Sequence, residues 1–275
     1  MIRFLFTAAI LAALPARAQK LDIISTVLSQ FEDGPALPGK ATYVGGETLF
    51  FSCQFSGYTK TEKETISLAY EMEAFDDNRV PLAKKESKTI ETELAPEDKD
   101  WKPKVRYQFV TPDTALCENC VLRVTLRDKL ASTEATKEIP FRIRSRAVEP
   151  SPTLTVRNFR YLRSEEDARP LAVPAYRPGD DLWARFEITG FQHGEGNRIQ
   201  VEYGLKVFRP SGKLLYEEPK AAVFDESSFY PKRYINGILN LRLQGLSPGE
   251  YPVVLEVRDL TGNQQFEERF PFRVE

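Results

Sequence analysis

Short segments of the chain alternate between apolar and polar residues with a period of two. In one of them, Leu49, Phe51, Cys53 and Phe55 occupy every second position. This period predicts β-strands with one face buried and the other wet. The apolar positions of the other predicted strands are Ile66, Leu68, Tyr70 and Met72; Val105, Tyr107 and Phe109; Leu122, Val124 and Leu126; Ile139, Phe141 and Ile143; Leu182, Ala184, Phe186 and Ile188; Ile199, Val201, Tyr203 and Leu205; Leu239, Leu241 and Leu243; Val253, Leu255 and Val257; and Phe270, Phe272 and Val274.

The second half of the chain repeats the first at an offset of 133 residues. The run YVGGETL at 43–49 is answered by YRPGDDL at 176–182. Ordered matches over most of both halves indicate two copies of one structural unit. Further matches, after a two-residue change in spacing, are Arg127-Asp128 with Arg258-Asp259 and Pro140-Phe141-Arg142 with Pro271-Phe272-Arg273.

No helical pattern of 10–15 residues interrupts the predicted strands, which excludes folds built from alternating strands and helices. Each half is therefore expected to pack two antiparallel sheets face to face. The sequence predicts an all-β protein of two tandem β-sandwich domains, over residues 19–147 and 148–275. The segment 145–152, with Pro150 and Pro152, is expected to be a short, stiff linker between them.

The end of each copy resembles the last strands of bacterial immunoglobulin-like or fibronectin-III-like modules. The resemblance lies in Pro248-Gly249-Glu250-Tyr251, Arg258-Asp259, a glycine turn and the closing Phe272-Arg273-Val274. It implies a sandwich fold and the roles of a spacer, an adhesin or an interaction domain. The spacing of cysteine and tryptophan seen in true immunoglobulin domains is absent from the sequence.

The N-terminus has the features of a secretory signal peptide. Arg3 is followed by an apolar run from Phe4 to Leu14, and Ala16 and Ala18 suit signal peptidase. We expect cleavage near Ala18, a signal peptide over residues 1–18, and export to the periplasm or the extracellular space. An uncleaved anchor is the alternative, but the apolar run is shorter than the ~18 residues needed to span a bilayer. No later stretch is apolar enough for a transmembrane segment.

The charge balance excludes one class of partner. The formal net charge is −2, and both halves are close to neutral. Nucleic-acid binding, which needs a basic surface, is therefore not expected. The second half has more arginine than lysine. This slightly favours partner binding, because the planar guanidinium group can donate two parallel hydrogen bonds and can stack on aromatic rings.

The three cysteines allow more than one pairing. Cys117 and Cys120 replace the turn that the second copy builds from Pro248 to Tyr251, and they enter a strand rather than a helix. We expect a disulfide between them that staples the turn in an oxidising compartment, not a redox or metal site. Cys53 then stays free and buried. A Cys53–Cys120 bridge across the sandwich, with Cys117 free, is the alternative.

No residue pattern commits the chain to a reaction. His193, the only histidine, lies in a glycine-rich loop, and no nucleophile motif accompanies it. Acidic clusters such as Glu165-Glu166-Asp167 do not have EF-hand spacing, so they leave only the possibility of a calcium site between the domains. We therefore expect no catalytic residues, no cofactor and no metal site.

Aromatic residues outside the predicted core are the candidate binding surface. Phe50 and Trp183 fall at the same repeat position, on the face opposite the core. Trp101, Tyr230 and Tyr234 lie in loop segments and could add to it. A covering strand or the neighbouring domain would make Phe50 and Trp183 structural; otherwise they could stack on a partner or a glycan.

These observations lead to three functional hypotheses. The first is a non-enzymatic interaction or scaffold protein whose partner is another envelope or extracellular protein, or a glycan. The second is a pair of carbohydrate-binding modules, supported by the scattered aromatic residues. The third, an enzyme, lacks a convergent set of polar groups in the sequence.

Overall fold

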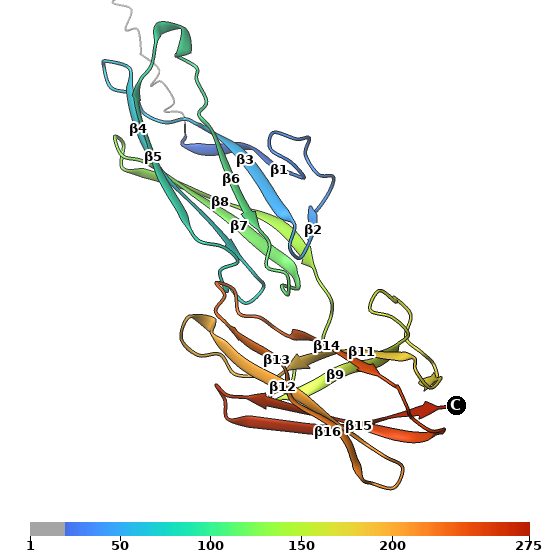
Figure 1. The fold of residues 1–275 in the computed structure, drawn as a ribbon. Coiled ribbons are helices and arrows are strands. Elements are labelled where there is room, and N and C mark those ends of the chain that lie inside the picture. The colour runs from blue at the N-terminus through green and yellow to red at the C-terminus, as the bar shows by residue number, and fades with distance from the viewer. Residues whose placement is uncertain (1–19) are drawn as a thin grey trace, which may run out of the picture.

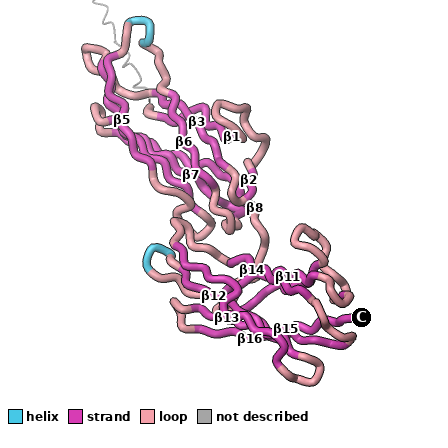
Figure 2. Tube along the Cα trace, in the orientation of Figure 1, coloured by secondary structure: helices cyan, strands magenta, loops and turns pink. Residues whose placement is uncertain are grey.

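The computed structural model describes residues 20–275, so the predicted signal peptide lies outside the described residues. Two β-sandwiches follow one another end to end, joined by the segment between β8 and β9 (Figure 1). The described chain is strands and loops, apart from two short 3₁₀ turns at Pro96–Asp98 and Glu195–Asn197 (Figure 2). The prediction of an all-β, two-sandwich fold is confirmed.

The first sandwich packs a three-stranded sheet, β1-β3-β6, against a five-stranded sheet, β2-β8-β7-β4-β5. The short β2–β8 pair is parallel, and the other pairs are antiparallel. Its strands are β1 Asp22–Ser29, β2 Thr42–Val44, β3 Thr48–Ser56, β4 Thr65–Phe75, β5 Glu86–Glu93, β6 Lys104–Val110, β7 Cys117–Asp128 and β8 Thr133–Arg144.

The second sandwich has the same strand order. Its sheets are β9-β11-β14 and β10-β16-β15-β12-β13, and β10–β16 is again the parallel pair. The sequence repeat is therefore a repeat of topology. Its strands are β9 Thr155–Leu162, β10 Ala175–Tyr176, β11 Asp181–Thr189, β12 Ile199–Phe208, β13 Leu214–Glu226, β14 Ile235–Arg242, β15 Gly249–Asp259 and β16 Gln264–Val274.

Each sandwich closes a core of its own between its two sheets. Leu49 and Val124 in the first sandwich, and Leu182 and Leu255 in the second, are all 0 % exposed. They occupy the positions that the period-two pattern assigned to the inner face. Burying a large aliphatic side chain contributes roughly 1.5–3 kcal/mol, so the alternation is the main source of stability for each sandwich.

Matching residues of the two copies make matching contacts. Tyr43 donates its hydroxyl hydrogen bond to the carbonyl of Ser29 at 3.0 Å, and Tyr176 donates to that of Leu162 at 2.9 Å. In both sandwiches this hydrogen bond connects the end of the first strand, β1 or β9, to the short strand that follows the next loop, β2 or β10.

A buried aspartate organises two loops in each sandwich. Asp259, 1 % exposed, accepts backbone N–H groups from Gln192 at 2.9 Å, Thr261 at 3.0 Å and Gly262 at 3.1 Å. Asp128 does the same in the first sandwich, with the backbone N–H groups of Thr59, Leu130 and Ala131. In each copy, the aspartate of the repeated Arg-Asp motif therefore connects two loops. One loop follows β3 or β11, and the other is the hairpin turn between β7 and β8 or between β15 and β16.

Candidate functional site at the junction of the two sandwiches

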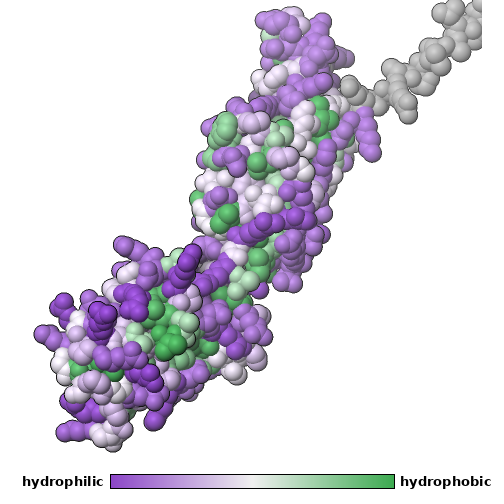
Figure 3. All heavy atoms as spheres, turned by 90° about the vertical axis from the view of Figure 1, so that its right-hand side faces the viewer, coloured by the Kyte–Doolittle hydropathy of each residue, from purple (hydrophilic) through white to green (hydrophobic). Residues whose placement is uncertain are grey.

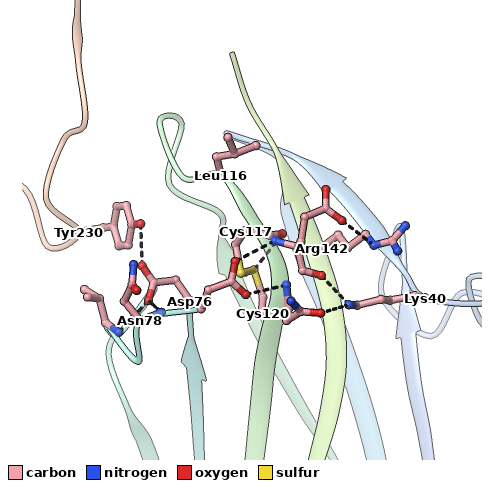
Figure 4. Close-up of a disulfide and its surroundings, with 12 residues drawn as sticks. Lys40, Asp76, Asn78, Leu116, Cys117, Cys120, Arg142 and Tyr230 are labelled. Carbon is pink, nitrogen blue, oxygen red and sulfur yellow. Dashed lines mark hydrogen bonds and ion pairs between the residues drawn. A yellow bond between two sulfur atoms is a disulfide. The ribbon is translucent and has the colours of Figure 1, made fainter. Parts of the chain in front are cut away.

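Tyr230, between β13 and β14, is a side chain of the second sandwich that packs into the first. Its ring packs in the hydrophobic cluster of the first sandwich, and its hydroxyl donates to Oδ2 of Asp76 at 2.9 Å (Figure 4). The other oxygen of Asp76 accepts the backbone N–H groups of Asn78 and Val80 at 2.8 and 2.9 Å. Burial, reinforced by Asp76, raises the pKa of Tyr230 well above its ordinary value, so the hydroxyl remains a donor.

This placement corrects one sequence-based expectation. Tyr230 and Tyr234 were named as loop residues that could add to the contact surface, but each is only 7 % exposed. The prediction is wrong for both, because the segment before β14 packs against the first sandwich rather than projecting into solvent.

Arg233 adds two polar contacts to the junction. Its backbone N–H donates to Oγ1 of Thr114 at 3.3 Å, and its guanidinium donates to the carbonyl of Leu116 at 3.2 Å. Thr114 and Leu116 lie immediately before β7. The segment before β14 therefore binds both the turn after β4 and the loop that enters β7.

The two neighbouring cysteines lie in the strand that begins beside these contacts. Cys117 and Cys120 are at disulfide distance, with Cα atoms 5.6 Å apart (Figure 4). Oxygens of Asp77 accept the backbone N–H groups of Glu118 at 3.1 Å and Asn119 at 2.7 Å. The turn is thus tied to the same Asp76-Asp77 segment that receives Tyr230.

Cys53 is free and 0 % exposed in the core of the first sandwich. Burial raises the pKa of its thiol to about 12, which leaves almost no reactive thiolate near neutral pH. The alternative bridge between Cys53 and Cys120 is not formed in this structure.

Mass mapping of the unreduced protein should find one bridge, within the peptide that contains both Cys117 and Cys120. Iodoacetamide should label Cys53 only after unfolding, because its thiol is buried and protonated. A peptide cross-linked to Cys53, or rapid labelling of Cys53 in the native protein, would contradict this assignment.

A surface cavity of about 330 Å³ lies between the two sandwiches. The first sandwich contributes Leu82, Val110 and residues 111–113, and the second contributes the segment from Ser228 to Tyr230 with Lys232. Val110 is 63 % exposed and Phe229 is 50 % exposed, so both offer apolar surface at its rim. The space-filling view shows hydrophobic side chains among charged ones near the contact of the two sandwiches (Figure 3).

Phe50 and Trp183 lie at equivalent positions on the outer faces of the three-stranded sheets. Each is half-buried, and each lines a surface cavity, of about 280 Å³ at Phe50 and about 360 Å³ at Trp183. Arg106 and Asp33, which pair at 2.6 Å, also line the cavity at Phe50. Their pairing lowers the pKa of Asp33 to about 2, so the carboxylate is charged at any ordinary pH.

Trp101 does not join this surface. It is 39 % exposed in the loop before β6, near the opposite end of β3 from Phe50. Phe55, which is hydrogen-bonded to Pro103, lies five residues along the strand from Phe50, a separation of about 17 Å. Phe50, Trp183 and Trp101, the three aromatic residues named as candidates for binding, are therefore at separate places, and their role in binding stays a prediction.

Groups that could perform chemistry are dispersed in the described part of the chain. His193 is exposed, with Nε2 3.1 Å from the carbonyl of Lys232. Residues 20–275 hold no cluster of three or more histidine, cysteine or carboxylate side chains arranged to bind a metal ion. Within the same residues, no helix is both long and apolar enough to cross a membrane.

Comparison with known proteins adds only distant structural likeness. No family model matches the chain, and no curated protein sequence matches it. The chain is similar to dimeric latent PorU from Porphyromonas gingivalis, with 15% identity, a TM-score of 0.29, and coverage of 93% of this chain and 24% of PorU. It is also similar to a family 123 glycoside hydrolase from Clostridium perfringens, with 13% identity, a TM-score of 0.30, and coverage of 45% and 27%. The chain thus spans about a quarter of the length of each of these proteins.

Proposed function

We propose that this chain is an exported, non-enzymatic interaction protein that binds a partner protein of the envelope or the extracellular space. The observation that carries the proposal is the junction cavity, whose wall comes from both sandwiches. Cavities between domains are frequent binding sites, because two surfaces can converge on one ligand there. The immunoglobulin-like resemblance of the two modules supports the same class of role.

The contacts behind the cavity support its use as a fixed binding surface. Tyr230 and Arg233 attach the second sandwich to the first through a buried ring and three hydrogen bonds. Exposed apolar side chains at the rim, Val110 and Phe229, suit an apolar anchor of a partner. Lys232 and Asp113 in the lining could orient that partner by charge.

Site-specific photo-crosslinking tests this proposal. A photoreactive residue at Phe229, in the full chain expressed in its own envelope, should give a discrete cross-linked protein, because Phe229 lies on the rim of the cavity. The matched control is Val223, which is 58 % exposed on β13 of the same sandwich. Equal products at Phe229 and Val223, or none at Phe229, would contradict a partner at the junction.

Carbohydrate binding is a second candidate function. It is favoured by the repeated pairing of an outer-face aromatic residue with a surface cavity, at Phe50 and at Trp183. Aromatic faces stack on sugar rings while neighbouring polar groups bind the hydroxyls. The residues around Phe50 include Ser52, Arg106 and Gln108, which supply donors and acceptors.

A glycan array separates this candidate from the first. If the modules bind sugars, Phe50→Ala and Trp183→Ala should each weaken binding by about tenfold, the loss of one stacking contact. Tyr216→Ala, at an exposed tyrosine on β13, is the matched control and should leave binding unchanged. Absence of any glycan signal for the unaltered chain would remove this candidate.

A further inference from the structure

The second sandwich has an arginine-rich cavity beside the linker that the proposed function does not use. It measures about 350 Å³ on the outer face of the β9-β11-β14 sheet. Arg146 of the linker, Arg160 of β9 and Arg185 of β11 line it, together with Glu187, Asn236 and Ile238. The arginines that line this cavity thus come from three separate segments of the chain.

Glu187 orients two of these arginines. Its side chain is fully buried although it points away from the core. Oε1 pairs with Nη1 of Arg146 at 2.8 Å and with Nη1 of Arg160 at 3.2 Å, and Oε2 accepts from Nδ2 of Asn158 at 3.0 Å. Glu187 therefore carries one negative charge but pairs with two guanidinium groups, each of which carries a positive charge. One positive charge of this group has no counter-charge within it.

Two further arginines, Arg185 and Arg157, lie beside this group. Arg185 donates to the backbone carbonyl of Glu165, and Arg157 lies opposite Glu187 in the sheet register. Neither arginine pairs with a carboxylate among residues 20–275. In a protein of net charge −2, four arginines next to one carboxylate form a local concentration of positive charge.

The first sandwich shows that the fold does not require this cluster. Arg160 and Arg185 face each other directly across β9 and β11, where like charges are destabilising. The equivalent pair in the first sandwich is Val27 and Ser52, which also face each other. Gln54 and Ile24 stand where the second sandwich has Glu187 and Arg157. The second sandwich thus has two arginines facing each other at a place where the first sandwich has two uncharged residues.

We propose that this cavity binds an oxyanion group, a carboxylate or a phosphate, carried by a small organic ligand. Guanidinium groups donate paired hydrogen bonds to such anions, and an anion between Arg160 and Arg185 would relieve their repulsion. Asn236 offers a further polar contact, and Ile238, 37 % exposed, offers apolar surface for the organic part. The inference goes beyond the junction proposal and stands whether or not the junction cavity has a partner.

Three related probes distinguish the anionic group from the sugar that carries it. We would titrate the mature chain at low salt with glucose, glucuronate and glucose 6-phosphate, following the amide signals of Asn236 and Gly237 by NMR. Glucuronate or glucose 6-phosphate, or both, should shift these signals with millimolar affinity, and about 0.5 M NaCl should suppress the shift. Glucose should not shift them.

The key variant is Arg185→Gln, which leaves the pairs of Glu187 intact. It should weaken binding by about tenfold, while the amide spectrum shows that the protein remains folded. The matched control is Arg198→Gln, at an exposed arginine that pairs with Asp225 away from this sheet, and it should bind as the unaltered chain does. Equal binding of glucose, equal affinity in Arg185→Gln, or no shift up to about 50 mM of either anion would overturn the proposal.

Discussion

Replacing Asp259 with alanine should lower the free energy of unfolding of the second sandwich by about 3 kcal/mol, because buried N–H donors lose their acceptor. The Asp259 carboxylate serves the backbone N–H groups of Gln192, Thr261 and Gly262, and it also accepts from the side-chain amide of Gln264 at 3.2 Å. Denaturant unfolding measures the loss directly, and the melting temperature should fall by about 10 °C.

Two further variants make this result specific. Asp128→Ala should cost a similar amount in the first sandwich, since Asp128 holds the equivalent loops there. Asp225→Ala removes an exposed partner of Arg198 and should cost less than about 1 kcal/mol. A loss for Asp259→Ala no larger than that for Asp225→Ala would show that the buried carboxylate does not organise the loops.

Tyr230→Ala should separate the unfolding of the two sandwiches. The change removes a buried ring from the cluster of the first sandwich and the bond to Asp76, a loss of about 2–4 kcal/mol of contact between the modules. We expect the unaltered chain to unfold in one coupled transition and the variant in two. Calorimetry of the full chain distinguishes these outcomes.

The neighbouring phenylalanine provides the control for this change. Phe229→Ala removes an aromatic ring of similar size that is 50 % exposed, so it should leave the coupling of the transitions unchanged. Tyr230→Phe keeps the ring and removes only the hydrogen bond to Asp76, and should cost about 1 kcal/mol. If Tyr230→Ala and Phe229→Ala behave alike, Tyr230 does not couple the modules.

The sequence predicted the fold well where a strand buries only one face. The alternation around Leu49 and Leu182 places these residues at the core, and the repeat indicates that both halves share one topology. The period-two pattern did not predict the first strands, β1 and β9, the edge strands, β5 and β13, or the short strands β2 and β10. In β5 no residue is fully buried, so no alternation marks the strand. In β1 the bulge between Ile24 and Val27 breaks the period of two.

The junction could not be predicted, because it depends on contacts between residues far apart in the chain. Tyr230 and Asp76 are 154 positions apart, and nothing near either residue signals the other. A tyrosine in a loop can be exposed or buried, and the local sequence does not distinguish the two cases. Tyr230 was expected to be exposed, and it is buried. The arginine cavity had only a weak signal in the sequence, which was the excess of arginine over lysine in the second half. That excess does not show which arginines lie side by side, because their positions depend on the register of β9 and β11.

Residual dipolar couplings test most directly whether the two sandwiches form one body. Backbone N–H couplings from residues 22–144 and from residues 155–274 would be measured on the full chain in a weakly aligning medium. If Tyr230 and Arg233 fix the junction, one alignment tensor fits both sets, and Tyr230→Ala requires two. Two different tensors for the unaltered chain would mean that the sandwiches move independently, and the junction cavity would then not be a fixed site.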